Sequence, residues 1–440
     1  MIAKSLKYAA LAALGTTLAA VVPALAQNEQ FIPSLVYRTG PYAPNGIPFA
    51  NGVADYLKLV NERDGGINGV KITTEECETS YATDRGVECY ERLKGKGPTG
   101  ASLFMPLSTG ITYALMEKVP GDKIPLLNSG YGRSESGDGN VIPWSFPILG
   151  TYWDAADIAM TYIAKEVGDW DKLKGKKIAL VYHDSPYGKE PIPLLQALAK
   201  QHGFDVELLP VTHPGVEQKA TWLQIRQNRP DFVLLWGWGV MNSTALKEAA
   251  AVAYPRDKML GVWWAGNESD TVPAEDAAKG YKALALNPTG SNFPVHADIF
   301  KYLYDKNLGV ADRKDVGSVL YNRGVINALF AVEAIRTAQG KFGNKPLAGE
   351  QIRWGLENLD LPADKVTKLG FEGLLRPTKV TCQDHTGGSQ ARVFQWDGKT
   401  WQFISDWIQS DQKVVRPMIE AAAKKYAQEK NLSSDACKQS

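Results

Sequence analysis

The stretch that decides the fold is residues 101–112, which read Ala-Ser-Leu-Phe-Met-Pro-Leu-Ser-Thr-Gly-Ile-Thr. A short apolar run ends at Met105, and the residues after it take up a helical pattern. The run is typical of a buried parallel strand, and Ser108 and Thr109 stand where a helix caps its free N–H groups. A strand that ends at a helix N-terminus offers N–H groups and hydroxyls to an anion. On these residues alone, a simple helix cap is the first interpretation and an anion site the second.

The N-terminus has the features of an exported chain. Lys4 and Lys7 precede an apolar run over residues 9–22, and Ala24-Leu25-Ala26 forms an Ala-x-Ala cleavage site. Residues 1–26 are therefore predicted to be a signal peptide, and the mature chain to be exported. No later stretch is long and apolar enough to span a bilayer.

The charge balance excludes one class of partner. The chain has 49 basic and 48 acidic residues, for a formal net charge of +1. A balanced chain offers no electrostatic surface for nucleic acid, so none is expected as a partner. A length of 440 residues is too great for one simple core and predicts two domains.

Four cysteines in an exported chain indicate disulfides. Three pairings are possible. We favour Cys77 with Cys89, which closes a short loop, and Cys382 with Cys437, which ties down the C-terminal tail. No cysteine or histidine spacing fits a metal site, and none is predicted.

Apolar runs and helical patterns alternate along most of the chain, which predicts parallel sheets with helices on both faces. Expected strands cover residues 35–39, 70–74, 103–105, 124–128, 178–182, 206–210, 232–236, 260–264 and 282–287. Residues 390–408, with Trp396-Asp397-Gly398 at their centre, are expected to form a hairpin, and residues 414–429 a last helix. An extended segment near residues 143–147 separates two alternating blocks.

Several short motifs follow one another in a fixed order over nearly the whole mature chain. They are Gly40-Pro41-Tyr42-Ala43, Leu107-Ser108-Thr109-Gly110, Tyr182-His183-Asp184, Trp236-Gly237-Trp238-Gly239 and Val393-Phe394-Gln395-Trp396. In this order and spacing the chain resembles the periplasmic leucine/isoleucine/valine-binding proteins, the solute-binding subunits of branched-chain-type amino acid ABC importers.

The resemblance implies an α/β chain with the type I periplasmic binding protein fold: two doubly wound parallel-sheet lobes joined by three crossovers around a central cleft. Carried onto this sequence, lobe 1 is residues 27–149 plus 282–389, and lobe 2 is residues 150–281 plus 390–440. A ligand in such a cleft lies beyond the carboxyl ends of the strands, where the motifs fall.

Members of this family hold the ligand carboxylate with two loops of the first lobe. One loop corresponds to Ser108 and Thr109, which moves the anion interpretation ahead of the cap. The other corresponds to Gly130 and Tyr131. Arg133 follows in that loop, either as a charged donor for an acid or as a solvated surface charge.

Aromatic residues at other strand ends are expected to line the cleft. Tyr42 and Tyr187 match cleft positions of the family, and Trp238 and Trp264 follow the ends of two strands. The family's acid for a ligand ammonium is offset here, so Glu268 is either that acid or an ordinary loop acid.

Tyr321 or Asn322, in a segment that resembles the family's hinge region, would also reach the cleft. The more probable role for Asn322 is a helix cap.

The resemblance implies binding without catalysis, and no cofactor. The expected ligand is a small amphipathic carboxylate: a branched-chain or aromatic amino acid, or an aromatic acid. The expected partners are an ABC permease and its ATPase subunits, and the chain is expected to be a monomer. A ligand sensor of the same fold and an exported enzyme are the alternatives, although no Gly-x-Ser-x-Gly nucleophile motif is present.

Overall fold

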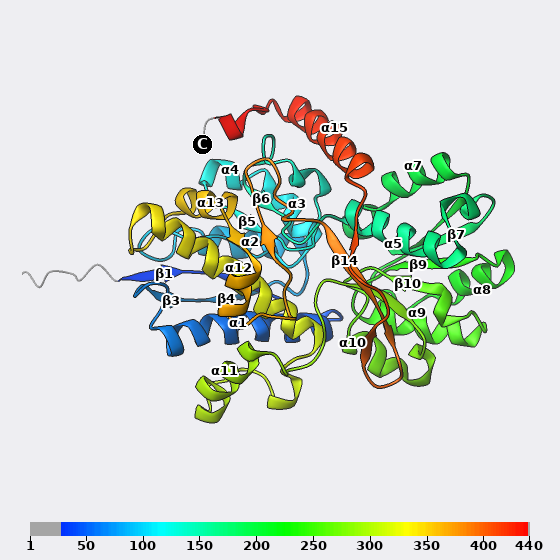
Figure 1. The fold of residues 1–440 in the computed structure, drawn as a ribbon, viewed down its shortest axis with the longest axis horizontal. Coiled ribbons are helices and arrows are strands. Elements are labelled where there is room, and N and C mark those ends of the chain that lie inside the picture. The colour runs from blue at the N-terminus through cyan, green and yellow to red at the C-terminus, as the bar shows by residue number, and fades with distance from the viewer. Residues whose placement is uncertain (1–27, 439–440) are drawn as a thin grey trace, which may run out of the picture.

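The computed structural model describes residues 28–438, which form two bodies on either side of a central junction (Figure 1). We call the body built around strands β1–β6 lobe 1 and the body built around the eight-stranded sheet lobe 2. The predicted signal peptide, residues 1–26, lies outside the described residues.

The strands of lobe 1 are short and parallel. They are β1 (Glu29–Phe31), β2 (Ser34–Val36), β3 (Lys71–Thr73), β4 (Glu76–Glu78), β5 (Leu126–Leu127) and β6 (Ser145–Phe146). β1 pairs with β3, β2 with β4 and β5 with β6, and a bridge from Phe104 to Leu126 takes the expected strand 103–105 into the same layer.

Lobe 2 holds a sheet in the order β15-β14-β11-β10-β9-β7-β8, with β16 also paired to β14. Its strands are β7 (Lys177–His183), β8 (Asp205–Val211), β9 (Phe232–Trp236), β10 (Met259–Gly261), β11 (Lys282–Ala285), β14 (Gln390–Trp396), β15 (Trp401–Phe403) and β16 (Ile408–Gln409). The strands from β7 to β11 pair in parallel, while the predicted hairpin β14–β15 is antiparallel. A separate antiparallel pair joins β12 (Asp360–Leu361) to β13 (Thr378–Lys379).

Helices cover both faces of the sheets (Figure 1). They are α1 (Ala43–Asp64), α2 (Thr83–Leu93), α3 (Thr109–Met116), α4 (Val119–Asp122), α5 (Tyr152–Val167), α6 (Pro186–Lys189), α7 (Ile192–His202), α8 (Lys219–Asn228), α9 (Val240–Ala251), α10 (Glu268–Thr271), α11 (Pro294–Tyr302), α12 (Val319–Phe342), α13 (Gly349–Glu357), α14 (Ala363–Lys368) and α15 (Gln412–Lys430). The alternation of strands and helices read from the sequence is thus confirmed.

Helices α1 and α12 of lobe 1 pack with their backbones in close contact. A Cβ atom on Gly52 of α1 would lie 2.1 Å from the carbonyl oxygen of Tyr321, and one on Gly324 of α12 would lie 2.1 Å from that of Phe49. Only glycine permits this approach. It fixes the N-terminal ends of both helices, which carry side chains toward lobe 2.

The point where the chain returns to lobe 1 differs from the expected boundary before residue 282. Strand β11 pairs with β10 and β14 inside the lobe 2 sheet, so the return follows Ala285. The antiparallel partner β14 covers what would otherwise be an exposed edge of β11, which explains its place in this sheet. The other lobe ranges stay a prediction.

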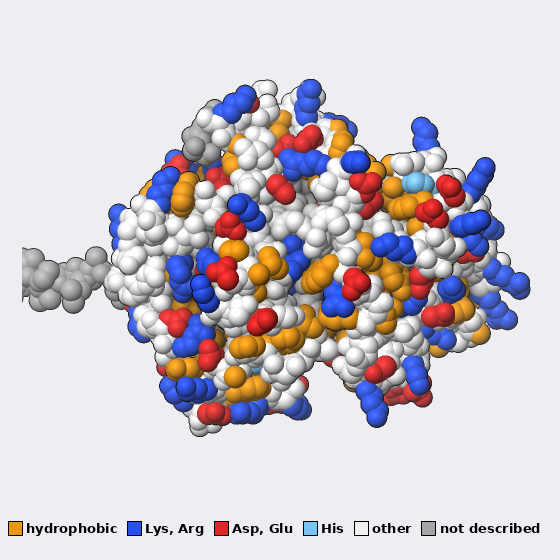
Figure 2. All heavy atoms as spheres, viewed as in Figure 1, with side chains coloured by type: hydrophobic (Ala, Val, Ile, Leu, Met, Phe, Trp, Pro, Cys, Tyr) orange, Lys and Arg blue, Asp and Glu red, His pale blue; other side chains and the backbone are white. Residues whose placement is uncertain are grey.

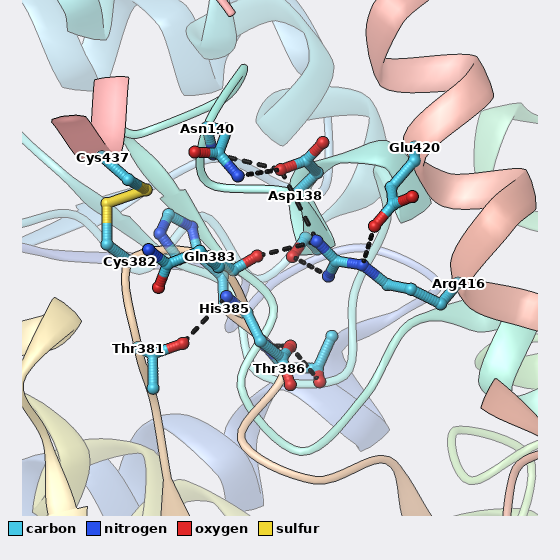
Figure 3. A network of polar contacts seen from close by, with 12 residues as sticks. Asp138, Asn140, Thr381, Cys382, Gln383, His385, Thr386, Arg416, Glu420 and Cys437 are labelled. Atoms are coloured by element: carbon cyan, nitrogen blue, oxygen red, sulfur yellow. Dashed lines mark hydrogen bonds and ion pairs between the residues drawn. A yellow bond between two sulfur atoms is a disulfide. The ribbon is translucent and has the colours of Figure 1, made fainter. Parts of the chain in front are cut away.

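Helix α15 contacts both lobes, although the sequence interpretation placed it in lobe 2 alone. At its N-terminal end, Gln412 donates to Asp154 of α5. Farther along, Arg416 donates to the carbonyls of Gly137 and Gln383 in lobe 1, and Figure 3 shows the contact with Gln383. Arg416 also pairs with Glu420 on its own helix.

Both predicted disulfides are present. Cys77 joins Cys89 across 12 residues, and Cys382 joins Cys437 across 55 residues (Figure 3). The second bridge attaches the C-terminal tail to lobe 1, and the N–H of Ala436 reinforces it by donating to the carbonyl of Asn140.

Acidic and basic side chains are interspersed on the face shown in Figure 2, with no large area of one sign. Within residues 28–438, no helix combines the length and the apolar character that crossing a membrane requires.

Replacing Cys382 and Cys437 with serine is expected to lower the free energy of unfolding by about 2–4 kcal/mol, because the unfolded chain loses its longest covalent loop. Urea unfolding followed by circular dichroism measures the change. Serine at Cys77 and Cys89 is the matched control and should cost less, since that loop is shorter. A larger loss in the control would contradict the loop-entropy explanation.

Candidate functional site

The corner at residues 101–112 lies where lobe 1 meets lobe 2. Ser108 is the N-cap of α3, and its Oγ accepts a hydrogen bond from the N–H of Ile111 at 3.4 Å. Thr109 is 1% exposed, and its Oγ1 has no hydrogen-bond partner among the described residues. The cap interpretation therefore describes Ser108 in this structure, while the neighbouring hydroxyl is buried and unpaired.

The loop after β5 makes a double contact across the lobes. The carbonyl oxygen of Gly130 accepts hydrogen bonds from the indole N–H groups of Trp263 and Trp264, at 2.9 and 2.8 Å. The N–H of Gly130 donates to Ile148 within lobe 1. Both backbone groups of Gly130 are thus used by the protein, and its φ of +69° is the left-handed conformation that glycine adopts most easily.

Aromatic rings from both lobes pack at this junction. Tyr131 of lobe 1 stacks on Trp264 of lobe 2 with ring centroids 4.5 Å apart, and Trp238 meets Trp264 edge-on at 5.6 Å. The Tyr131 hydroxyl and the Trp238 indole N–H are buried, and neither finds a partner within residues 28–438. Two predicted wall residues, Trp238 and Trp264, thus meet Tyr131 of the predicted carboxylate loop, with two polar groups unsatisfied among them.

Tyr42 crosses between the lobes at the start of α1. Its hydroxyl lies 2.7 Å from Nε2 of His183 and 2.9 Å from Nδ1 of His213, both in lobe 2. Burial raises the pKa of Tyr42 to about 12. Burial, with the neighbouring His213, lowers the pKa of His183 to about 3, so that imidazole is neutral at pH 7.

Tyr187 takes part in packing inside lobe 2. Its hydroxyl donates to the carbonyl of Gly237 at 2.9 Å, and its ring lies 5.3 Å from that of Tyr152. The Tyr187 hydroxyl therefore has no hydrogen left to donate to a ligand. Its side chain supports the loop that carries Trp238.

Glu268 has partners of its own. One carboxylate oxygen accepts from the hydroxyl of Thr289 at 2.6 Å, and the other from the N–H of Val319 at 2.9 Å. Val319 is the first residue of α12, so Glu268 caps that helix from outside, where a negative charge is favourable. Burial raises the pKa of Glu268 above its usual range.

Two further acids of lobe 2 face lobe 1. Glu190 accepts hydrogen bonds from the hydroxyls of Tyr113 and Ser134. Burial, and then the nearby Glu135, raise the pKa of Glu190.

Asp270 accepts from the side-chain amide of Asn45 of lobe 1 at 3.2 Å and from that of Asn267. Burial raises its pKa to about 8. Contact between the lobes thus includes buried carboxyl groups that favour their neutral form.

Two buried groups at the junction were not predicted from the sequence. Burial raises the pKa of the Tyr152 hydroxyl, and the Thr109 hydroxyl that faces it acts in the opposite direction. The two hydroxyls do not reach a well-formed hydrogen bond, and neither has another partner among the described residues. Arg323 of α12 is 1% exposed and lies over the ring of Trp264, 4.7 Å from its centroid. Tyr152 stands just after a strand end, which is a usable signal, whereas Arg323 is indistinguishable from other residues of a long helix.

Other polar residues considered from the sequence point elsewhere. Arg133 pairs with Glu135, and its guanidinium lies over Tyr426 of α15. Tyr321 donates to Asp55, and Asn322 binds loop carbonyls near the start of α12.

A cavity of about 830 Å³ lies in lobe 1 between α4, α13 and α15, away from the junction. Apolar side chains such as Val119, Trp144, Trp354 and Leu432 line it, and none of the predicted site residues does. Over residues 28–438, no group of three or more potential ligands is placed to hold a metal ion.

Comparison with known proteins places these features in a family. The family profile described as "Periplasmic binding protein" matches residues 29–400. A search of curated proteins finds no significant match.

Solved structures match over almost the full chain. One from the Pseudomonas fluorescens group, described as an ABC transporter permease, is 46% identical, with 92% of this chain and 98% of that chain covered and a TM-score of 0.86. A branched-chain amino acid ABC transporter protein from Thermus thermophilus with bound valine is 22% identical, with coverage of 90% and 99% and a TM-score of 0.75. A solute-binding protein of R. palustris in complex with benzoate is 15% identical, with coverage of 87% and 98% and a TM-score of 0.67. The last two show the fold alone, which is the type I periplasmic binding protein fold predicted from the sequence.

The free energy of unfolding is expected to fall as the pH rises from about 6.5 to about 8.5. Asp270 has a pKa of about 8 when folded and an ordinary carboxyl pKa of about 3.9 when unfolded. The folded state therefore binds more protons between these values and loses stability as pH rises, by at most about 1.4 kcal/mol per pH unit for one group. Urea unfolding at several pH values measures the slope.

Asp270→Asn should flatten that slope, whereas Asp276→Asn, at an exposed position of the same segment, should leave it unchanged. Stability that rises with pH across this interval would contradict the assignment.

Proposed function

The chain belongs to the periplasmic binding protein family, in its leucine/isoleucine/valine-binding-like group, and from this premise we propose that it is the solute-binding component of an ABC importer. It captures a small amphipathic carboxylate between its lobes in the periplasm and delivers it to a membrane permease with its ATPase subunits. It acts as a monomer and releases the ligand unchanged.

One observation carries this proposal. Where the two lobes meet, Thr109, Tyr131, Tyr152 and Trp238 bury polar atoms that have no hydrogen-bond partner among the described residues. Leaving such a group unsatisfied costs about 1–3 kcal/mol. Groups of this kind, gathered between aromatic rings, are matched by a ligand that brings apolar surface and hydrogen-bond acceptors together.

The proposed mechanism is closure of the lobes around the ligand. Direct contacts from Tyr42 to His183 and from Gly130 to Trp264 join the lobes in the arrangement described. A ligand that touches both lobes favours this closed arrangement by its differential affinity. A micromolar dissociation constant requires about 8 kcal/mol, which a few hydrogen bonds and ring contacts can supply.

A thermal-shift screen of amino acids, aromatic carboxylates and aliphatic carboxylates tests the ligand class. A ligand at 100 times its dissociation constant should stabilise the protein by about 2.7 kcal/mol. Chromatography of the mixture should return the ligand unchanged, and turnover would favour an enzyme instead. Deleting the gene should abolish uptake of the ligand, whereas a sensor would leave uptake intact.

Thr109→Val is expected to weaken binding of the best ligand from that screen about 5- to 10-fold, because it removes an unpaired hydroxyl that the ligand would engage. The free protein should be as stable as the wild type or more stable. Calorimetric titration and thermal melting measure the two effects.

Thr112→Val is the matched control on the same helix. The Thr112 hydroxyl already donates to the carbonyl of Ser108 at 2.8 Å, so this change should lower stability without a comparable loss of affinity. Equal affinities for wild type and Thr109→Val would argue against Thr109 as a ligand group.

A further inference from the structure

The three acids at the junction of the lobes are already hydrogen-bonded within the protein. Each has a hydrogen bond on both carboxylate oxygens: Glu190 from Tyr113 and Ser134, Asp270 from Asn45 and Asn267, and Glu268 from Thr289 and the N–H of Val319. A ligand ammonium needs an acceptor that carries negative charge, but burial raises the pKa of all three acids and so favours their neutral form. The acids of the junction are therefore poorly suited to an amino group.

The unsatisfied groups at the same junction are of the opposite kind. Five buried hydrogen-bond donors lack a partner among the described residues: the hydroxyls of Thr109, Tyr131 and Tyr152, the indole N–H of Trp238 and one terminal nitrogen of Arg323. The amide oxygen of Asn45, beside Asp270, is unpaired too, but it is a neutral acceptor. The indole and guanidinium nitrogens can only donate. The junction thus offers donors and lacks free acceptors that carry charge.

Arg323 gives this surplus of donors a positive charge. Its Nε donates to the side-chain carbonyl of Asn287 at 3.0 Å, and one terminal nitrogen donates to the carbonyl of Trp263. Both partners are neutral, and its Nη2 is unpaired. Burial lowers the pKa of Arg323 to about 10, so the side chain is still a cation at pH 7. A buried cation without a bonded anion is costly, and an anionic ligand removes that cost.

The position of Arg323 relates it to the other unpaired groups. Its guanidinium lies over Trp264, whose ring also stacks on Tyr131. Against the effect of burial, Tyr131, Tyr152 and then Glu268 raise the pKa of Arg323, so both hydroxyls and this acid lie within its electrostatic reach. Glu268 is not hydrogen-bonded to Arg323, because its two oxygens accept from Thr289 and Val319. The guanidinium of Arg323 and the unpaired hydroxyls are therefore grouped around the Trp264 ring, where one ligand could contact them together.

Resting on the proposed function, we infer that the ligand is a carboxylate without an α-ammonium group, and that Arg323 supplies the positive charge that selects it. The ligand class is thus a flat or branched apolar acid rather than an amino acid. The aromatic rings take its apolar part, and the donors take its carboxylate.

Calorimetric titration with matched pairs tests the ligand class. The pairs are 3-phenylpropanoate with L-phenylalanine, phenylacetate with phenylglycine, and 4-methylpentanoate with L-leucine, each differing only in the α-amino group. The acid of at least one pair should bind at least 10-fold more tightly than its amino acid. An amino acid that binds as tightly as its partner acid, or more tightly, overturns this inference and leaves the proposed function standing. If no carboxylate from the screen or these pairs binds, the proposed function fails as well.

Arg323→Met tests the role of the arginine, with 3-phenylpropanoate and its neutral amide, 3-phenylpropanamide, as probes. The variant should lose at least 10-fold in affinity for the acid and much less for the amide, and Arg323→Lys should recover part of the loss. Arg336→Met is the control, because it makes the same change on the same helix at a partly exposed site paired with Glu333.

A merely structural role for Arg323 predicts an equal loss for acid and amide, and that result would overturn the assignment. Thermal melting establishes whether each variant folds. If Arg323→Met does not fold, the ratio of acid to amide affinity in Arg323→Lys decides: a lowered ratio supports the assignment, and an unchanged ratio overturns it.

Discussion

The contact between the lobes depends on pairing the polar groups that it buries away from water. A single carbonyl, that of Gly130, accepts the indole N–H groups of both Trp263 and Trp264. Without that acceptor, two indole donors would be buried unpaired at a cost of about 1–3 kcal/mol each. The same demand explains why Tyr42 lies between two histidines and why the carboxyl of Glu190 meets two hydroxyls. Polar complementarity therefore fixes how the lobes fit, together with the aromatic packing of Tyr131, Trp238 and Trp264.

The groups that stay unpaired are as informative as those that pair. The backbone of Gly130 and the hydroxyl of Tyr187 satisfy themselves within the protein, so they shape the junction without offering free bonds. Thr109, Tyr131 and Trp238 combine near-complete burial with an unused polar atom. A folded chain keeps such atoms at a function-bearing site more readily than in its core, because there another molecule can satisfy them.

Much of the fold could be predicted from the sequence, because alternating apolar runs report which segments are strands and which are helices. Both disulfides and the hairpin at Trp396 follow from such local signals. The family resemblance pointed to Tyr131 and the position after a strand end to Trp264, and the two rings do meet. What the sequence could not show is which residues of the other lobe each side chain meets. No local pattern shows whether Glu268 is an ordinary loop acid or caps a helix that begins 51 residues later. Likewise, no local pattern distinguishes Arg323 from the other residues of α12.

Helix α15 has a mechanical consequence for the lobe closure proposed above. Its first turn is held by α5 of lobe 2, while Arg416 and the bridge from Cys437 to Cys382 hold the remainder to lobe 1. A rigid rod pinned at both ends on opposite sides of a hinge acts as a tether and limits the amplitude of opening. A wider opening would first have to detach part of this helix from one lobe. Because the disulfide holds its C-terminal end to lobe 1, the hydrogen bond to α5 of lobe 2 would break first.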